Sequence, residues 1–228
     1  MTLSLPPASR LYGRRKGRPL RSRKTGLVAQ KLPALRIALP VSEQGGLDPF
    51  ALFSPRPRAV WLEIGFGGGE HLATQAKKHT DIGFIGCEPF LNGVAGLLDH
   101  IDRDGLTNVR ILADDARPLL DALQEAAIDR CFVLFPDPWP KARHAARRFV
   151  GQENCARLAR ILSRGAELRL ASDDPGLIGW IRERMQEAPE FEKLWDLPVP
   201  PEDWVETRYE QKAYKAGRQP AYMAYRRR

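Results

Sequence analysis

The residues best suited to chemistry lie in segment 135–144, which reads FPDPWPKARH. In this segment Asp137 stands between two prolines, and cations follow within a few residues. Proline fixes its own φ and restricts the residue before it, so the main chain around Asp137 has few conformations open to it. A rigid turn with an exposed aspartate is the commoner meaning of such a composition. A carboxylate held in this way is also what a preorganised catalytic group requires.

A second segment, 61–69, reads WLEIGFGGG and predicts a strand that turns through glycines into a helix. Such a loop exposes backbone N–H groups at Gly65 and Gly67 and lets a ligand approach the main chain closely. A dinucleotide fingerprint would place a small residue three positions after Gly67, where this chain has Glu70. Glu63 would also repel a pyrophosphate, so an NAD-linked oxidoreductase is disfavoured. The Glu63 carboxylate can instead accept hydrogen bonds from the ammonium group of S-adenosylmethionine, which carries no phosphate.

Three more acids, Glu88, Asp115 and Asp137, come at or just after the ends of predicted strands. In a doubly wound sheet Glu88 would meet ribose hydroxyls, and Asp115 lies where the exocyclic amine of adenine could be bound. Taken singly, each acid is more easily explained as a helix cap or a solvated loop residue. Together with Glu63 they would open onto one carboxyl edge of the sheet, and this favours a cofactor site.

A methyl-donating sulfonium needs a nucleophile aligned with its methyl group. N7 of guanine qualifies without a base, because it already carries a free lone pair. Catalysis would then consist of alignment, desolvation and stabilisation of the positive charge that develops on the purine, and Asp137 can perform the last task. No nucleophilic triad or metal site competes, since the histidines are scattered and we expect each to be an ordinary surface or helix residue: His71, His79, His100 and His144.

The charge of the chain predicts an anionic partner. The formal net charge is +8 and the isoelectric point is near 9.7, which favours nucleic acid ahead of an anionic membrane surface. A charge run is usually a solvated face. The position of one run directly after the proposed catalytic turn favours a substrate role instead, with phosphates held by Lys141, Arg143, His144, Arg147 and Arg148.

From residue 58 onward, short apolar runs alternate with amphipathic stretches of helical length. We expect strands over 59–64, 82–87, 109–112, 131–135 and 167–171, and helices over 71–78, 91–104, 118–127, 150–161 and 177–187. This alternation predicts an α/β fold with a doubly wound, mostly parallel sheet. The tail predicts two more strands, over 191–195 and 221–225, and a polar stretch over 207–215 that can form a helix.

We interpret residues 1–56 as a basic N-terminal arm and linker, partly disordered, and residues 57–228 as the catalytic domain. The three cysteines are widely spaced and form no CxxC pair, which argues against a disulfide framework or a zinc site. No segment approaches the roughly 18–20 apolar residues of a membrane span. We expect a cytoplasmic protein that uses neither a membrane nor a metal, and the sequence requires no protein partner.

The chain resembles the bacterial tRNA (guanine-N7)-methyltransferase family, whose class I S-adenosylmethionine-dependent enzymes modify guanine 46 in the variable loop of tRNA. The matching pieces are LEIGFG at 62–67, GCE at 86–88, DA at 115–116, FPDPWPKARH at 135–144 with RR at 147–148, ASD at 171–173 and TRYE at 207–210. The glycine loop is specific only to the class. The PDPW segment with its basic continuation and the Thr-x-x-Glu near the C-terminus are specific to the family.

The resemblance implies a product that contains 7-methylguanosine and a seven-stranded Rossmann-like methyltransferase sheet whose last strand runs antiparallel. It implies S-adenosylmethionine contacts at Glu63, Glu88, Asp115 and Asp137, with Asp137 also catalytic. It implies substrate contacts at Lys141, Asp173, Thr207, Arg208, Tyr209 and Glu210, with RNA following the stretch 143–148. An alternative is a non-catalytic RNA-binding protein on a degenerate methyltransferase fold, against which the intact set of acids argues.

Overall fold

Seven strands form one sheet in the computed structural model, which describes residues 15–39 and 46–228. Their order across the sheet is β3-β2-β1-β4-β5-β7-β6. The strands are β1 (Ala59–Ile64), β2 (Ile82–Cys87), β3 (Val109–Leu112), β4 (Ile128–Leu134), β5 (Leu162–Ser172), β6 (Phe191–Leu197) and β7 (Ala221–Arg227). Only β7 among these is antiparallel to its neighbours. The predicted doubly wound sheet with an antiparallel last strand is confirmed.

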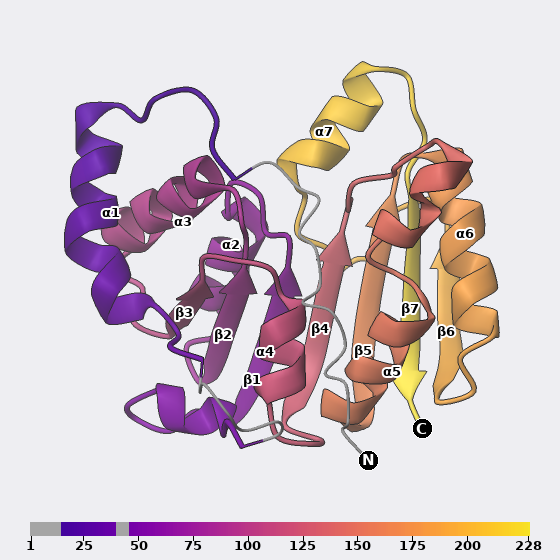
Figure 1. Cartoon of the computed structure of the whole chain (residues 1–228), viewed down its shortest axis with the longest axis horizontal. Helices are drawn as coiled ribbons and strands as arrows, with labels where there is room; N and C mark the ends of the chain where they lie inside the picture. Colours follow the sequence, from indigo (N-terminus) through magenta and orange to yellow (C-terminus); the bar gives the residue numbers. More distant parts are fainter. Residues whose placement is uncertain (1–14, 40–45) are drawn as a thin grey trace, which may run out of the picture.

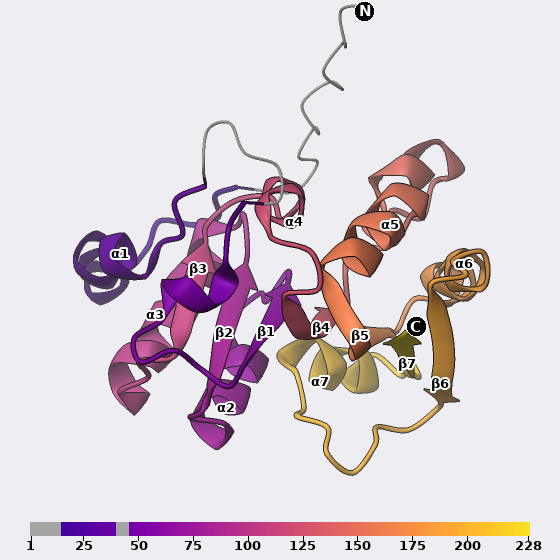
Figure 2. The same ribbon diagram turned by 90° about the horizontal axis from the view of Figure 1, so that it is seen from below.

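Helices cover both faces of this sheet (Figures 1 and 2). One face carries α2 (Glu70–Lys78), α3 (Leu91–Asp104) and α7 (Arg208–Lys215), and the other carries α4 (Arg117–Ala122), α5 (Gln152–Ile161) and α6 (Pro175–Gln186). Because both faces are covered, the inner strands bury residues on both faces: all six residues of β2 and five of the six residues of β1 are buried. The sheet therefore forms a rigid base whose carboxyl edge can hold a site.

Several element bounds agree with the sequence prediction, and two differ for reasons that involve long-range pairing. The first three strands and α3 have the predicted bounds. The helix predicted over 118–127 ends at Ala122, because Leu47 pairs with the chain there: its N–H donates to the carbonyl of Ala122, and its carbonyl accepts from Gln124. The β5 strand begins at Leu162 rather than at residue 167, since Leu162 pairs with Ile128 at the start of β4.

Part of segment 1–56 belongs to the folded domain. Helix α1 (Ser22–Leu35) packs along α3, and Leu27 is buried there in a cluster with α2 and α3. Ile37 and Phe53 are buried in the cluster on the opposite face of the sheet. Our expectation that 1–56 contributes arm and linker but no core is wrong at these positions. We predict partial disorder for residues 1–56 as a whole, and residues 1–14 and 40–45 of this segment lie outside the described residues.

Helix α1 is not predicted from the sequence because of its composition. Apolar residues in α1 are interrupted by Arg, Lys and Pro33, so the helical period is weak. Its attachment combines the buried Leu27 with ion pairs to a distant helix, including Arg23 to Asp99 at 2.8 Å and Lys31 to Asp102 at 2.8 Å. Among the helices of the described residues, none has the length and apolar character that a bilayer crossing needs.

Candidate active site

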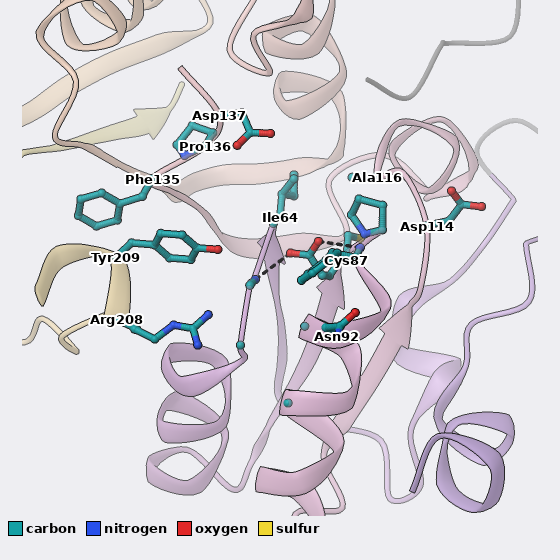
Figure 3. Close-up of a pocket in the computed structure, with 18 of the residues that line it drawn as sticks. Ile64, Cys87, Asn92, Asp114, Ala116, Phe135, Pro136, Asp137, Arg208 and Tyr209 are labelled. Carbon is teal, nitrogen blue, oxygen red and sulfur yellow. Dashed lines mark hydrogen bonds between the residues drawn. The ribbon is translucent and has the colours of Figure 1, made fainter. Parts of the chain in front are cut away.

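A cavity of about 850 Å³ opens at the carboxyl edge of β1 to β4 (Figure 3). Its wall is built from the glycine loop after β1, the ends of β2, β3 and β4, the start of α3 and the start of α7. Five of the six predicted cofactor residues line it, namely Gly65, Gly67, Glu88, Asp115 and Asp137. The structure therefore brings together residues that are more than 70 positions apart in the chain, as a parallel sheet does at its carboxyl edge.

The glycine loop adopts a shape that requires glycine. Gly65 and Gly67 have φ of 75° and 56°, in the left-handed region where a side chain is strained. Helix α3 then packs directly on the loop: a Cβ at Gly93 would collide with the carbonyl oxygen of Gly67, and one at Gly96 would lie 2.7 Å from that of Gly68. The loop is thus held against α3 with no room for side chains between them.

Glu88 is oriented by two backbone N–H groups. Its carboxylate accepts hydrogen bonds from Gly67 at 2.8 Å and from Phe90 at 2.9 Å. Burial nevertheless raises the pKa of Glu88 above its ordinary value, because desolvation of the carboxylate outweighs the two donors. The nearby Asp137 and Glu63 carboxylates raise it further. A hydroxyl donor from a ligand would relieve this cost.

Glu63 lies behind the glycine loop and is not among the residues that line the cavity. Its Oε2 lies 2.7 Å from Nδ1 of His71, and both side chains are buried. Nε2 of His71 is in turn 3.3 Å from the amide nitrogen of Gln75. We expected His71 to be an ordinary surface or helix residue; it lies on α2 but is buried as the partner of Glu63. The spacing of eight residues across a strand-loop-helix turn is the signal that could have indicated this pair.

Asp115 is held by Arg117, a residue that sequence reasoning missed. The backbone N–H of Arg117 donates to Oδ1 of Asp115 at 2.8 Å, and its guanidinium lies 2.6 Å from Oδ2. The neighbouring Asp114 pairs with Arg15 of the N-terminal segment at 3.0 Å. The end of β3 is therefore fixed from both sides.

The turn that carries Asp137 is strained on both sides. Phe135 and Trp139 have φ of 51° and 42°, values that cost bulky residues of the order of 1–3 kcal/mol each. The Asp137 side chain is exposed at the cavity, and it makes no hydrogen bond or ion pair with any residue of the described ranges. Among the described residues, this carboxylate therefore keeps its hydrogen-bond acceptors open to the cavity.

The predicted basic stretch divides into residues with different surroundings. Arg147 lines the cavity, and its guanidinium lies over the ring of Trp139 at 5.0 Å. Arg148 turns inward, donates to the carbonyl oxygens of Pro138 and Trp139 at 3.0 and 3.3 Å, and stacks on Trp180. The remaining predicted cations lie on or beside the short 3-10 helix η2 (Ala142–Arg147), outside the cavity wall: Lys141, Arg143 and His144.

The Thr-x-x-Glu motif builds the start of α7. Thr207 Oγ1 accepts from the N–H of Glu210 at 3.0 Å, and the Glu210 carboxylate accepts from the N–H of Thr207 at 3.2 Å. Glu210 also accepts from Trp204 Nε1 at 2.8 Å and from the hydroxyl of Tyr222. Both motif residues are buried, so their contacts are internal to the protein.

Between these two buried residues, Arg208 and Tyr209 point toward the cavity (Figure 3). The Tyr209 ring lies against the glycine loop, where a Cβ on Gly67 would be 2.7 Å from it. Burial is the main reason that the pKa of Tyr209 is raised, and the Glu88 carboxylate adds to it. Asp173, the remaining predicted substrate residue, is not in the cavity wall and pairs with Arg218 at 2.6 Å. No group of three or more potential metal ligands occurs within residues 15–39 and 46–228.

A family model described as "Putative methyltransferase" matches residues 57–223. Among solved structures, the 16S rRNA methyltransferase KamB has a TM-score of 0.60 at 15% identity, with 84% of this chain and 99% of that chain covered. TrmN from Thermus thermophilus has a TM-score of 0.55 at 16% identity, with 78% and 47% covered. At these identities the likeness shows the Rossmann-like methyltransferase fold alone.

Curated relatives are far more similar in sequence. The tRNA (guanine-N(7)-)-methyltransferase of Paramagnetospirillum magneticum is 49% identical, with 96% of this chain and 93% of that protein covered. The protein of the same name from Rhodospirillum rubrum is also 49% identical, with 96% and 88% covered. These comparisons confirm the resemblance that the PDPW and Thr-x-x-Glu segments indicate. The chain belongs to the tRNA (guanine-N(7)-)-methyltransferase family.

Proposed function

We propose that this protein transfers the methyl group of S-adenosylmethionine to N7 of guanine 46 in the variable loop of tRNA, in the cytoplasm. The observation that carries the proposal is the Asp137 carboxylate, which faces the cavity without a partner among the described residues, on a backbone strained at Phe135 and Trp139. The names of the relatives at 49% identity support the same activity.

The wall of the cavity fits S-adenosylmethionine. Its volume of about 850 Å³ lies within the range of about 300–1,000 Å³ typical of small-molecule sites. Carboxylates of Glu88, Asp115 and Asp137 line it, which suits a ligand with a sulfonium and an ammonium group. The bound cofactor would supply an electrophilic methyl group. Glu88 would accept from its ribose hydroxyls, Asp115 would lie at the adenine, and the main chain at Gly65 and Gly67 would approach its amino-acid part.

Glu63 has a different place in this proposal from the one that the resemblance implies. Its carboxylate is engaged with His71 behind the loop, at 2.7 Å. We infer that Glu63 positions the glycine loop from behind, since its buried contact with His71 links the end of β1 to α2. Direct contact with the cofactor would have to use the other oxygen of Glu63, Oε1, because Oε2 is engaged with His71.

Asp137 acts on the acceptor by its charge and its fixed position. Because N7 of guanine has a free lone pair, the chain need not supply a general base. It must align the purine, exclude water and stabilise the positive charge that develops on the ring. The Asp137 carboxylate provides the negative charge and can accept N–H groups of the guanine edge. Tyr209 and Arg208 face the same cavity from α7 and would contact the entering nucleotide (Figure 3).

The phosphates of tRNA would be held by Lys141, Arg143 and His144, which lie outside the cavity wall, and by Arg147 at the wall. Thr207 and Glu210 act through the cap of α7, which presents Arg208 and Tyr209. Asp173 stays a predicted substrate contact. We infer that Arg148 is not a phosphate ligand, because its Nε and Nη2 donate to the turn that holds Asp137 and its guanidinium stacks on Trp180.

The test is methylation of a tRNA transcript made without modifications. The purified protein and S-adenosylmethionine should add one methyl group to the fragment that contains guanine 46, as seen by mass spectrometry after nuclease digestion. A transcript with adenine at position 46 is the matched control and should stay unmodified. Methylation at another nucleotide would contradict the assigned position, and no methylation of any tRNA would contradict the activity.

A further inference from the structure

The cofactor cavity has a wall that lies outside the family match. The match begins at residue 57, yet Pro19, Leu20, Arg21 and Lys24 line the cavity together with the glycine loop and Glu88. These residues belong to the segment 15–24, which runs from the first described residue into the first turn of α1. A sequence comparison of the catalytic domain alone would miss this part of the site.

The segment is docked on the start of α3 by backbone hydrogen bonds. The N–H of Leu91 donates to the carbonyl of Arg15 at 3.0 Å. The side chain of Asn92 makes two more bonds: its oxygen accepts from the N–H of Gly17 at 2.9 Å, and its amide donates to the carbonyl of Arg18 at 2.8 Å. The first turn of a helix has N–H groups without helical partners, so this docking satisfies one of them.

Two further attachments hold the ends of the segment. Arg15 pairs with Asp114 after β3 at 3.0 Å, which fixes the beginning. Arg23 reaches Asp99 and Asp102 of α3 at 2.8 and 3.3 Å, which fixes the end. All of these ion pairs are largely exposed, so each contributes little by itself. Several specific contacts therefore define the position of the segment, but the ion pairs among them contribute little free energy to its attachment.

The side of the cavity that the segment covers is the side assigned to the nucleoside. Asn92 lines the cavity and Asp114 lies at its edge, away from Tyr209 (Figure 3). Pro19 and Leu20 add apolar surface there, which suits the face of a purine ring, and Glu88 on the same side suits ribose hydroxyls. Arg21 and Lys24 lie beyond them at the rim.

We propose that residues 15–24 complete the cofactor site by covering the nucleoside end of S-adenosylmethionine. The proposal rests on the proposed function, which supplies the identity of the ligand and its orientation. Since the ligand and the start of α3 contact the same segment, each stabilises the docked position for the other. Cofactor affinity then depends on a part of the chain that precedes the catalytic domain.

The first experiment displaces the segment without changing a residue that lines the cavity. A Cβ on Gly17 would lie 2.7 Å from the ring of Phe90, so Gly17→Val pushes the segment away from α3. Gly26→Val is the matched control, because a Cβ on Gly26 of α1 meets nothing within 4 Å. Calorimetric titration with S-adenosylhomocysteine should show Kd raised about tenfold for Gly17→Val, which equals about 1.4 kcal/mol, and unchanged for Gly26→Val.

The second experiment uses the unaltered protein. Trypsin does not cleave after Arg18, because Pro19 follows it, but the segment contains exposed trypsin sites at Arg15, Lys16, Arg21 and Arg23. S-adenosylhomocysteine should slow cleavage at these sites severalfold, as measured by mass spectrometry of the fragments over time. The proposal would be overturned if both valine variants bound S-adenosylhomocysteine with the same Kd and the ligand did not change the rate of tryptic cleavage. That outcome would leave the proposed function intact. A wild-type protein that binds no S-adenosylhomocysteine would overturn both.

Discussion

The guanidinium of Arg148 donates a hydrogen bond to the carbonyl oxygen of Pro138 at 3.0 Å. The same guanidinium stacks on Trp180 of α6, 4.9 Å from the ring centroid, and Trp180 is itself fixed by its Nε1 donating to the carbonyl of Val150. A continuous set of contacts thus links α6 to the turn that holds Asp137. The adjacent Arg147 is directed to the cavity instead. Two neighbouring arginines therefore have different roles.

Arg148→Lys should lower kcat by about tenfold while leaving KM for tRNA unchanged. Lysine keeps the charge but cannot donate in the fork geometry that reaches two carbonyls, and one or two lost hydrogen bonds amount to about 1–2 kcal/mol. Steady-state kinetics at several salt concentrations measure both quantities. The comparison variant is Arg143→Gln, which should raise KM and reduce the salt slope of RNA binding by about 1. A raised KM with normal kcat in Arg148→Lys would make Arg148 a phosphate ligand after all.

Asp137→Asn should reduce kcat by about 100-fold or more, because the amide keeps the shape but removes the negative charge next to the developing cation. Stability should change by less than about 0.5 kcal/mol, since the carboxylate has no partner within the described residues. Single-turnover methylation and urea denaturation provide the two readouts. Normal turnover by this variant would remove Asp137 from the mechanism.

Gly93→Ala should destabilise the protein by about 1–3 kcal/mol and weaken cofactor binding, because its methyl group collides with the carbonyl of Gly67. Gly179→Ala on α6 is the control: a Cβ there meets nothing within 4 Å, and alanine should stabilise that helix by up to about 1 kcal/mol. Urea denaturation and calorimetric titration test both variants. Equal stability of the two proteins would show that α3 can move away from the loop freely.

Glu88 should make stability depend on pH in a defined direction. Burial raises the pKa of Glu88 in the folded protein, whereas the unfolded group titrates near about 4.3. The folded state therefore binds the proton more tightly, so the contribution of Glu88 to stability is complete below pH of about 4 and is lost as the pH rises through the folded pKa.

The free energy of unfolding of the wild type, minus that of Glu88→Gln, should accordingly fall between pH 4 and pH 7. Denaturation curves at a series of pH values measure this difference. A difference that grows with pH would contradict this prediction. It would mean that the N–H donors of Gly67 and Phe90 stabilise the charged Glu88 carboxylate by more than desolvation destabilises it.

Features that depend on short-range pattern were predictable from the sequence. The glycine loop, the alternation of strands and helices and the strand-end acids placed Gly67, Glu88, Asp115 and Asp137 at one edge of the sheet, where the structure has them. These predictions succeed because strand period and loop chemistry are local, and because parallel strands bring their carboxyl ends together.

The other features of the site and the fold could not be predicted from the sequence, because they depend on which side chains from distant parts of the chain become neighbours. Glu63 and a strand-end acid such as Glu88 look alike in the sequence, but only Glu63 has His71 beneath it. The basic run looks uniform, yet Trp180 lies more than 30 residues away and selects Arg148 as its partner. Helix α1 has a weak apolar period and is held by acids of α3.

The left-handed backbone at Phe135 and Trp139 sets a limit on how this enzyme can be engineered for heat tolerance. Glycine at either position would relieve local strain, and a screen for higher melting temperature would be drawn to such substitutions. The same change would loosen the support of Asp137. A higher melting temperature gained in this way would therefore be accompanied by a lower kcat. Improvements that spare activity should be sought at helix positions away from this turn, such as Gly179 of α6, where an added Cβ meets nothing within 4 Å.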